Sequence, residues 1–557
     1  MVSAPQPAST SSRLGRRDRP GLDEAVETVL GPGARLREAQ RDALDGLETH
    51  DTLLVARSGA GKTAVYAIAT LLAGRTTVVV SPLLALQRDQ VTALRAAGLR
   101  AEAVSSALGA RRRRTVAEAV RRGDVDVVLL APEQLAREDV LEDLARAGPG
   151  LLVVDEAHCV SEWGHDFRPD YRHLGGARRR IGDPRVLAMT ATASPRVREE
   201  VVQGLGLCGA RVLVHDADRP NIWLGARTVA GEAERDRVVV EAATSTAGAG
   251  IVYARTRRQV EDLVHALGAA GASALGYHAG LPADERRRTE RAFLSGSADL
   301  VVATSAFGMG VDRADVRFVV HAGAPPSLDE YYQEVGRAGR DGAAAVAVLV
   351  HDAGDVGRNH YLRAGGTPRD STLRRVLGAL PATGAQHAPT RSEVGARAGT
   401  SARTTARVLG LLAAVGAARG DGDAWCRADD RSPTTVLAAL HEHHERITAL
   451  ERSRVELVRT YAETTDCRRR VLLELLGEEH PERGGPGDNC DAGTSCDGAD
   501  DRLRVGQDVD HADWGRGTVS VVEPGRITVL FPDRGYVALD ADVVLDSGLL
   551  TPLPGTA

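Results

Sequence analysis

Short apolar runs alternate with longer amphipathic segments over most of the first 350 residues. Runs rich in leucine and β-branched residues predict buried strands at 53–56, 77–81, 126–131 and 151–156. The Ala-, Leu- and Arg-rich segments between these runs predict helices. The alternation restarts near residue 210, with predicted strands at 250–256, 298–305 and 316–323. This order predicts two similar parallel α/β lobes that bind ligands at the carboxyl ends of their strands.

The pattern changes at both ends of this core. Residues 1–20 are rich in Pro, Ser and Arg and lack an apolar centre, so they predict a disordered tail and not a signal peptide. The two lobes are expected at 21–208 and 209–355. Beyond them, the spacing predicts a helix-turn-helix of winged type at 370–432 and long helices with a Cys-bearing loop at 433–500. Short strands of a small β-barrel are predicted at 501–557.

Composition narrows the class of protein. Apolar residues make up 43% and charged residues 26% of the 557 residues, and no run approaches the roughly 18 apolar residues of a membrane-spanning helix. Six irregularly spaced cysteines fit a reducing cytoplasm, where we expect the protein to lie without membrane contact. The formal charge is −6, so nucleic-acid binding must depend on local basic patches.

The basic residues are strongly biased toward arginine. Of the 70, only Lys62 is a lysine. Most surface positions tolerate either residue, but a compact ammonium among phosphate oxygens cannot be replaced by a wide, planar guanidinium. The bias therefore marks Lys62 as functional. It also predicts that the arginine clusters at 111–114, 178–180, 286–288 and 468–470 are mostly solvated surfaces.

Lys62 belongs to a phosphate-binding loop. The sequence ARSGAGKT at 56–63 follows a predicted strand and opens a predicted helix. Its Ser58, Gly59 and Gly61 would let backbone N–H groups approach a polyphosphate. Lys62 would reach the β and γ phosphates, and the Thr63 hydroxyl would serve Mg²⁺. The loop therefore predicts ATP and Mg²⁺ as ligands.

Two adjacent carboxylates end the predicted strand at 151–156. Asp155 can hold Mg²⁺, and Glu156 can polarise the water that attacks the γ-phosphate. A strand end that merely caps the next helix commonly has one acid. The pair in LLVVDEAH, downstream of a phosphate loop, favours hydrolysis.

These motifs resemble those of superfamily-two helicases, and DEAHCVSEWGHDFRPDY at 155–171 is very similar to the RecQ family. The resemblance covers about 35–345 and, more loosely, 433–496. Further matching motifs lie in the expected order, at 81–91, 130–135, 189–194, 277–281, 303–321 and 331–342. The resemblance implies two RecA-like lobes and an ATP-dependent DNA helicase that moves 3′ to 5′ on single-stranded DNA in repair or recombination.

The resemblance also assigns roles to residues of both lobes. Arg337 and Arg340 would be arginine fingers from the second lobe, and their spacing of three predicts one shared helix face, with Gln333 one turn earlier. Arg37 and Gln40 would recognise adenine, although Leu36 and Gly33 stand where the family has aromatic residues. A DNA-coupling loop would contain Trp163, His165, Phe167 and Arg168; aromatic faces stack on unpaired bases.

The C-terminal third resembles the family less closely. The family's zinc region implies thiolate ligands here from Cys467, Cys490 and Cys496; Gly487 replaces one expected ligand, and His480 could complete the set. The alternative is a relic held by helix packing. The 503–551 segment resembles Tudor-like modules, which would serve protein or nucleic-acid contacts or act as a structural cap.

The sequence therefore predicts a DNA helicase acting on single-stranded and forked DNA. One alternative is a DNA-stimulated ATPase that remodels protein–DNA complexes without separating strands. It stays open because the winged segment precedes the zinc-like region, whereas the family usually places its winged helix after it. A nucleic-acid-binding adaptor with vestigial lobes is disfavoured by the complete set of Lys62, Glu156 and both arginine fingers.

Overall fold

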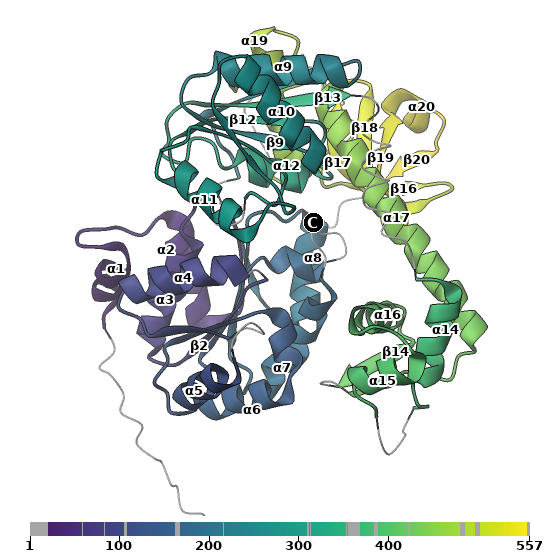
Figure 1. The fold of residues 1–557 in the computed structure, drawn as a ribbon. Coiled ribbons are helices and arrows are strands. Elements are labelled where there is room, and N and C mark those ends of the chain that lie inside the picture. The colour runs from purple at the N-terminus through teal and green to yellow at the C-terminus, as the bar shows by residue number, and fades with distance from the viewer. Residues whose placement is uncertain are drawn as a thin grey trace, which may run out of the picture.

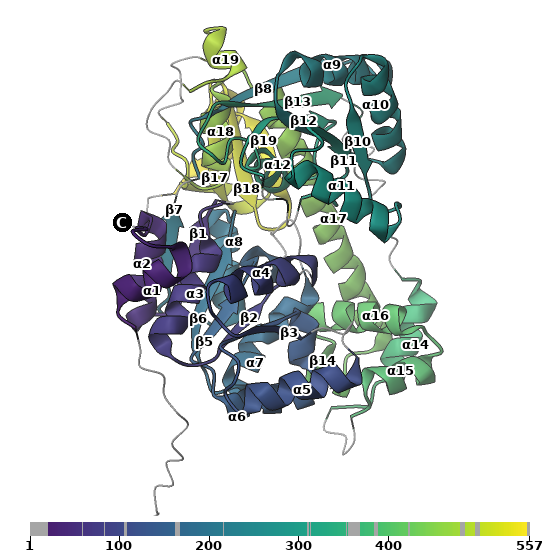
Figure 2. The ribbon, with the colours of Figure 1, turned by 60° about the vertical axis from the view of Figure 1, so that its left-hand side comes forward.

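A computed structural model describes residues 20–553, except 58, 83, 105–108, 162–167, 216, 309–310, 312, 353, 355–367, 384–387, 422–423, 479–484 and 496–501. Two lobes lie one above the other, and a long helix runs from the upper lobe to a separate helical module beside the lower one (Figure 1). The C-terminal strands pack beside the upper lobe and that long helix (Figures 1 and 2). Across the described ranges, every helix is too short or too polar to cross a lipid bilayer.

The lower lobe, lobe 1, is built on a parallel sheet whose described strands run in the order β3-β4-β2-β5-β6-β1-β7. The strands are Thr52–Ala56, Thr77–Val80, Ala101–Val104, Val127–Leu130, Leu151–Val154, Arg185–Thr190 and Arg211–His215, numbered β1 to β7. The helices are Leu22–Leu30, Glu38–Thr49, Lys62–Ala73, Leu84–Ala96, Ala110–Arg121, Glu138–Ala147, Leu174–Arg180 and Pro195–Leu205, numbered α1 to α8. The central strands are fully buried, as their unbroken apolar runs require.

One predicted boundary is wrong. The second lobe was predicted to begin at residue 209, but strand β7 pairs in parallel with β1 of lobe 1, from Thr52 with Arg211 to Ala56 with His215. It is an edge strand with exposed Arg211 and Val212, so it lacks the continuous apolar run that marks the inner strands. The segment between the two sheets therefore begins after His215 and ends at Ile222.

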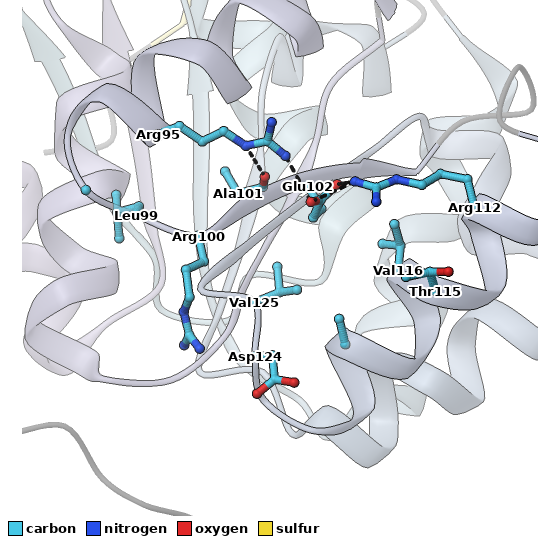
Figure 3. Close-up of a pocket in the computed structure, with 12 residues that line it drawn as sticks. Arg95, Leu99, Arg100, Ala101, Glu102, Arg112, Thr115, Val116, Asp124 and Val125 are labelled. Carbon is cyan, nitrogen blue, oxygen red and sulfur yellow. Dashed lines mark hydrogen bonds and ion pairs between the residues drawn. The ribbon is translucent and has the colours of Figure 1, made fainter.

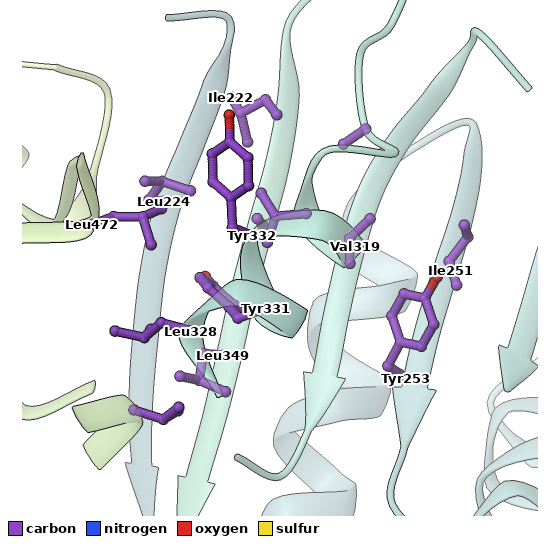
Figure 4. Close-up of a cluster of buried hydrophobic side chains, with 14 of the residues drawn as sticks. Ile222, Leu224, Ile251, Tyr253, Val319, Leu328, Tyr331, Tyr332, Leu349 and Leu472 are labelled. Carbon is purple, nitrogen blue, oxygen red and sulfur yellow. The ribbon is translucent and has the colours of Figure 1, made fainter. Parts of the chain in front are cut away.

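Lobe 2 has a parallel sheet of order β10-β11-β9-β12-β13-β8 in its described part. Its strands β8 to β13 are Ile222–Val229, Ala249–Ala254, Ala274–Tyr277, Leu300–Ala303, Val316–Ala322 and Ala345–Asp352, and its helices α9 to α12 are Glu232–Ser245, Arg257–Ala269, Ala283–Leu294 and Leu328–Val335. Helix α12 places Tyr331 and Tyr332 over the sheet (Figure 4). Leu472, from a helix far downstream, packs in the same cluster beside Leu224 of β8 (Figure 4).

A helical module follows lobe 2. It contains α14 (Asp370–Ala379), α15 (Arg391–Ala398), α16 (Ala402–Ala414) and the hairpin β14 (Ala418–Asp421) and β15 (Ala424–Arg427). An isolated bridge pairs Thr390 with Ala424 of the hairpin. The apolar cluster of this module also takes in Val436, Leu437 and Leu440 from the first turns of the next helix. The module thus has a core of its own.

The remaining helices and strands connect the module to the lobes. Helix α17 (Pro433–Glu463) is followed by α18 (Arg468–Leu475) and the short α19 (Asp488–Asp491). The C-terminal strands form an antiparallel sheet in the order β19-β18-β17-β16-β20, with β19 and β20 at its edges. Strands β16 to β20 are Asp508–His511, Gly515–Glu523, Arg526–Phe531, Gly535–Asp540 and Leu550–Pro552, and helix α20 is Ala541–Asp546. The barrel predicted for this segment is thus an open sheet over the described strands.

Three consecutive arginines of α18 correct another prediction. The run at 468–470 is one of the arginine clusters predicted to be mostly solvated, but Arg468, Arg469 and Arg470 are each only 6% exposed. Each guanidinium donates to a different part of the chain: Arg468 to Asp488 of α19, Arg469 to the segment between the two lobes, and Arg470 to Val522 of β17. Main-chain carbonyls and carboxylates accept from most of these buried donors, whereas the Nε groups of Arg469 and Arg470 have no hydrogen-bond partner among the described residues.

Arg470 lies among several carboxylates. It bonds Asp466 and Glu474, and Glu523 lies close by and accepts a bond from the Thr464 hydroxyl. One guanidinium cannot neutralise three buried carboxylates. Burial, together with the charges of Asp466 and Glu523 and against that of Arg470, raises the pKa of Glu474 to about 7.

We therefore predict a pH-dependent stability that Glu474 controls. A folded-state pKa above the ordinary 4.5 means that the folded state holds the proton more tightly, so stability present below pH 4.5 is lost as the pH rises toward 7. Glu474→Gln should remove on the order of 2 kcal/mol of this loss. The fall in unfolding temperature between pH 5 and pH 8 should then shrink by roughly 3 °C. Glu241→Gln, on the exposed surface of α9, is the control and should keep the wild-type fall.

Candidate functional site

The phosphate loop connects β1 to α3 at the carboxyl end of the lobe 1 sheet. Gly59 and Gly61 have φ of 81° and 79°, in the left-handed region that favours glycine. Helix α3 begins at Lys62, so its N-terminus faces the loop. The Lys62 ammonium donates to the Ala56 carbonyl at 2.8 Å, and burial lowers its pKa against the charges of Glu156 and Asp155. This geometry is that of an anion-binding loop.

Arg37 and Gln40 hold the same loop from the outside. The Gln40 amide donates to the carbonyls of Ala60 and Gly61 at 3.3 and 3.2 Å, and Arg37 donates to the Gly59 carbonyl at 2.7 Å. An ideal Cβ on Gly61 would lie 2.4 Å from the Gln40 amide nitrogen. The two residues predicted for adenine recognition therefore touch the phosphate loop directly.

Asp155 and Glu156 follow β5, beside the loop. Asp155 accepts a hydrogen bond from Gln90 of α4 at 3.0 Å and one from the backbone of Glu156. Burial, and then the charge of Glu156, raises the pKa of Asp155 to about 6, whereas Lys62 lowers it. Glu156 has φ of 50°, an unusual conformation for a residue with a side chain. Strained backbone of this kind is typical of functional sites.

A chain of buried polar side chains, not predicted from the sequence, leads away from Glu156. The Nδ1 atom of His158 lies 3.3 Å from the Glu156 carboxylate and 2.8 Å from the Thr190 hydroxyl. Thr190 in turn donates to the Thr192 carbonyl at 2.9 Å. Two sequence motifs could have predicted this chain: His158 belongs to DEAH, and Thr190 and Thr192 belong to TAT. All three side chains are buried.

Arg337 and Arg340 do not share a helix face, so that prediction is wrong. Helix α12 ends at Val335, and both arginines lie in the turn that follows, where Gly339 has φ of 55°. Glycines at 336 and 339 favour a turn over another helical turn. The side chain of Arg340 nevertheless comes within 3.8 Å of an ideal Cβ on Gly59 of the phosphate loop.

Both lobes line one cavity of about 540 Å³. Lobe 1 contributes Gly59, Gly61, Lys62, Thr63, Asp155 and Glu156, and lobe 2 contributes Gln333, Arg337 and Arg340. An apolar wall comes from α1, α3 and α4, including Leu30, Ala67 and Leu94. Cations, carboxylates and an apolar wall thus surround one interlobe space.

The aromatic loop is only partly described. Trp163, His165 and Phe167 lie outside the described residues, as does Ser58 of the phosphate loop. Arg168 is described: its backbone donates to the Cys159 carbonyl, and its guanidinium donates to the Pro82 carbonyl at 3.2 Å. This contact joins the end of the loop to the predicted motif at 81–91.

Two of the predicted zinc ligands lie together. Cys467 caps α18 and Cys490 lies in α19, and the two thiols are within hydrogen-bonding distance. Burial and the neighbouring thiol raise the pKa of Cys490. His480 and Cys496 lie outside the described residues, within which no group of three metal-binding side chains occurs.

A second hollow lies at the outer edge of lobe 1 (Figure 3). It is lined by residues that precede or begin β3 and β4, so it lies at the amino ends of these strands. Glu102 bridges Arg95 and Arg112 across it (Figure 3). Ligands of parallel sheets bind at the carboxyl ends, so this hollow is not the candidate site.

Known protein families match these regions in order. A model of the DEAD/DEAH box helicases matches residues 37–201, and one of the helicase conserved C-terminal domain matches 234–342. A RecQ zinc-binding model matches 430–498, and a family of unknown function (DUF3553) matches 505–546. The two lobes are therefore those of a superfamily-two helicase.

Individual relatives indicate which family of superfamily-two helicases this chain is similar to. The chain is 38% identical over 322 residues to a probable ATP-dependent DNA helicase RecS of Bacillus subtilis, covering 57% of this chain and 64% of the relative. It is 35% identical over 346 residues to the ATP-dependent DNA helicase RecQ of the same species, covering 62% and 55%. The chain belongs to the RecQ family, although it spans only about half to two thirds of the length of these relatives.

A solved structure supports the fold. The DUF1998 helicase MrfA bound to DNA is similar to this chain with a TM-score of 0.53, at 20% identity, over 75% of this chain and 61% of that one. At this identity the similarity concerns the arrangement of the lobes alone.

Proposed function

We propose that the protein is an ATP-dependent DNA helicase that moves 3′ to 5′ on single-stranded DNA and unwinds duplexes in DNA repair or recombination. The observation that carries the proposal is the interlobe cavity, where Lys62 and the carboxylates of lobe 1 face Arg337 and Arg340 of lobe 2. Because the two halves of the site lie on different lobes, hydrolysis requires the lobes to meet. Cycles of closure and opening can then move the lobes along a strand.

Each residue has a distinct role in this proposal. Lys62 and the N–H groups of the loop bind the phosphates, while Arg37 and Gln40 hold the loop and the nucleotide base. Glu156 orients and polarises the attacking water, in the geometry that His158 supports. Arg337 and Arg340 stabilise the charge of the transition state, and Gln333 lies beside them.

Mg²⁺ fits this site. Thr63 and Asp155 would hold it, and Asp155 is a buried carboxylate whose raised pKa shows that its charge is only partly compensated. When bound, Mg²⁺ neutralises developing charge on the phosphate oxygens.

We predict that Lys62→Ala and Lys62→Arg both lose at least about 99% of ATP hydrolysis, since a guanidinium cannot occupy the space of the ammonium. Both variants should still bind single-stranded DNA within about threefold of wild type. The measurements are steady-state ATPase rates and fluorescence anisotropy. Lys62→Arg with substantial hydrolysis would contradict the argument from the single lysine.

Fork unwinding separates the two candidate functions. Wild-type protein should unwind 3′-tailed duplexes, but not blunt or 5′-tailed ones, in an ATP-dependent manner. DNA-stimulated hydrolysis without strand separation would favour the remodelling translocase instead.

The DNA path is proposed to begin at the loop of Trp163, His165, Phe167 and Arg168, through base stacking and phosphate contact. The helical module at 370–427 would contact the duplex ahead of it. This segment has eight arginines and four acidic residues, whereas the whole chain has a formal charge of −6. Of these acids, Asp370 is paired with His441, and Glu393 belongs to the capping box of α15.

The order of elements in the module supports a winged helix. Helix α15, a turn through Gly399 and α16 give the helix-turn-helix, and β14–β15 would be the wing. Arg403 and Arg407, near the start of α16, are exposed on one face of that helix. The second helix of such a motif enters the major groove with its N-terminal residues at the bases.

We therefore predict that Arg403→Glu combined with Arg407→Glu weakens binding of a forked duplex at least about tenfold. ATP hydrolysis stimulated by single-stranded DNA should stay within about twofold, because the module is separate from the interlobe cavity. Arg237→Glu with Arg258→Glu, on exposed helices of lobe 2, is the matched control. Equal weakening in the control would assign the effect to net charge alone.

We also propose one structural Zn²⁺, held by Cys467, Cys490, Cys496 and His480. The adjacent thiols of Cys467 and Cys490 fit a soft, thiolate-binding metal. When bound, Zn²⁺ would cross-link α18 and α19. A protein partner for the C-terminal sheet remains a prediction.

Protein purified without added metal should contain about one zinc per chain by elemental analysis. Cys490→Ser should lower this to below about 0.2, because zinc requires the deprotonated thiolates, and should lower the unfolding temperature. Cys208→Ser, at an exposed cysteine of lobe 1, should keep the metal. A low zinc content that Cys490→Ser leaves unchanged would show that the family's metal site is lost here.

A further inference from the structure

A buried arginine holds the turn that contains both arginine fingers. Arg219, in the segment between the two sheets, is 7% exposed. Its guanidinium donates to the carbonyls of Gly336, Ala338 and Gly339, at 3.1, 2.5 and 2.9 Å. These three residues flank Arg337 and immediately precede Arg340. One planar side chain thus bonds most of the turn's backbone.

A second residue of the same segment fits against this turn. The Asn221 amide donates to the carbonyls of Gly339 and Ala343, each at 2.9 Å. An ideal Cβ on Gly339 would lie 2.4 Å from that amide nitrogen. In addition, the Tyr332 hydroxyl of α12 donates to the Ala217 carbonyl at 2.5 Å. Arg219 and Asn221 thus contact the finger turn, and Ala217 contacts the end of α12 that leads into it.

Arg469 of α18 fixes the backbone of this segment from the other side. It donates to the carbonyls of Arg219 and Ile222 at 3.2 and 3.1 Å, and it lies 3.3 Å from the Asp218 carboxylate. Cys467 is two residues upstream, at the cap of the same helix. Helix α18, the segment and the finger turn thus form one continuous series of contacts.

We propose that Arg219 is a positioning residue for Arg337 and Arg340, and that Arg469 holds Arg219 in place, so that α18 sets the rate of hydrolysis from outside both lobes. The proposal rests on the proposed ATPase function. Arg219 contacts only the backbone of the turn and does not line the interlobe cavity. It acts through the two fingers, whose guanidinium groups must meet the phosphates when the lobes close.

The electrostatics of the site explain why such support is needed. Arg219 lies near Arg57 of lobe 1 and Arg340 of the turn, and burial together with these two cations lowers the pKa of Arg219 to about 10. Like charges repel, so Arg219 stays beside the turn that carries Arg340 only if hydrogen bonds offset this repulsion. The hydrogen bonds from Arg219 to three carbonyls of the turn do so.

The proposal predicts a loss in kcat with little change in nucleotide binding. Arg219→Ala should lower the DNA-stimulated kcat about 10- to 100-fold, since small misplacements of catalytic groups have effects of this size. The KM for ATP and the Kd of a fluorescent ATP analogue should stay within about threefold, because the phosphate loop is untouched. Arg219→Lys should be intermediate, since one ammonium cannot span three carbonyls.

The control is Arg178→Lys, at a similarly enclosed arginine of lobe 1 whose guanidinium holds Asp51. It should lower the unfolding temperature about as much as Arg219→Lys and leave kcat within about twofold. A wild-type kcat in Arg219→Ala, or a fall in kcat matched by an equal loss of nucleotide affinity, would overturn the positioning role. Wild-type protein without any ATPase would instead overturn the proposed function itself.

A double-mutant cycle tests the contribution of Arg469. Arg469→Ala alone should lower kcat about 5- to 20-fold, and adding it to Arg219→Ala should cost less than about twofold more, because both changes break one series of contacts. Effects on kcat that multiply independently would show that α18 does not act through Arg219.

Discussion

Buried guanidinium groups that donate to main-chain carbonyls fix the positions of the separate units of this protein relative to one another. An arginine presents five N–H donors in a fixed plane, and its charge is costly to bury unless those donors are satisfied. Arg468, Arg469 and Arg470 find acceptors for most of these donors only where α19, the segment between the lobes and the C-terminal sheet all surround α18. Displacing any one of these units would leave a buried charge with lost partners, so α18 fixes the three together.

The same constraint extends into the interlobe site. Arg469 fixes the carbonyl of Arg219, and Arg219 fixes the turn of Arg337 and Arg340. Lobe 1 contributes its own fixed half, in which Gln40 and Arg37 hold the phosphate loop through its carbonyls. Both halves are thus pre-formed by bonds to backbone, whose positions vary little, and the distance between them is what lobe movement changes.

Features that depend on a local sequence pattern could be predicted from the sequence. The phosphate loop, the acid pair after β5 and the inner strands follow from glycines, a strand end and unbroken apolar runs. Strands β3, β6, β7, β8, β10 and β13 were not predicted, in part because their exposed or polar positions interrupt the apolar run. The spacing of Arg337 and Arg340 suggested a helix face, but glycines at 336 and 339 end the helix. The burial of Arg468–Arg470 depends on partners about 20 to 250 residues away along the chain, which no local pattern reveals.

Helix α17 makes the helical module part of the same mechanical unit. Its C-terminal half contributes Leu457, Val458 and Tyr461 to the core of lobe 2, and the Tyr461 hydroxyl lies 3.3 Å from that of Tyr331 in α12. Its first turns belong to the core of the module. A helix of 31 residues is about 46 Å long and stiff. A rotation of lobe 2 must therefore carry the module with it, unless the helix bends.

Leu450, midway along α17, also packs against the lobe 1 cluster. Closure of the two lobes must either preserve this contact as a pivot or break it, and in both cases the module moves relative to lobe 1 when the fingers reach the phosphates.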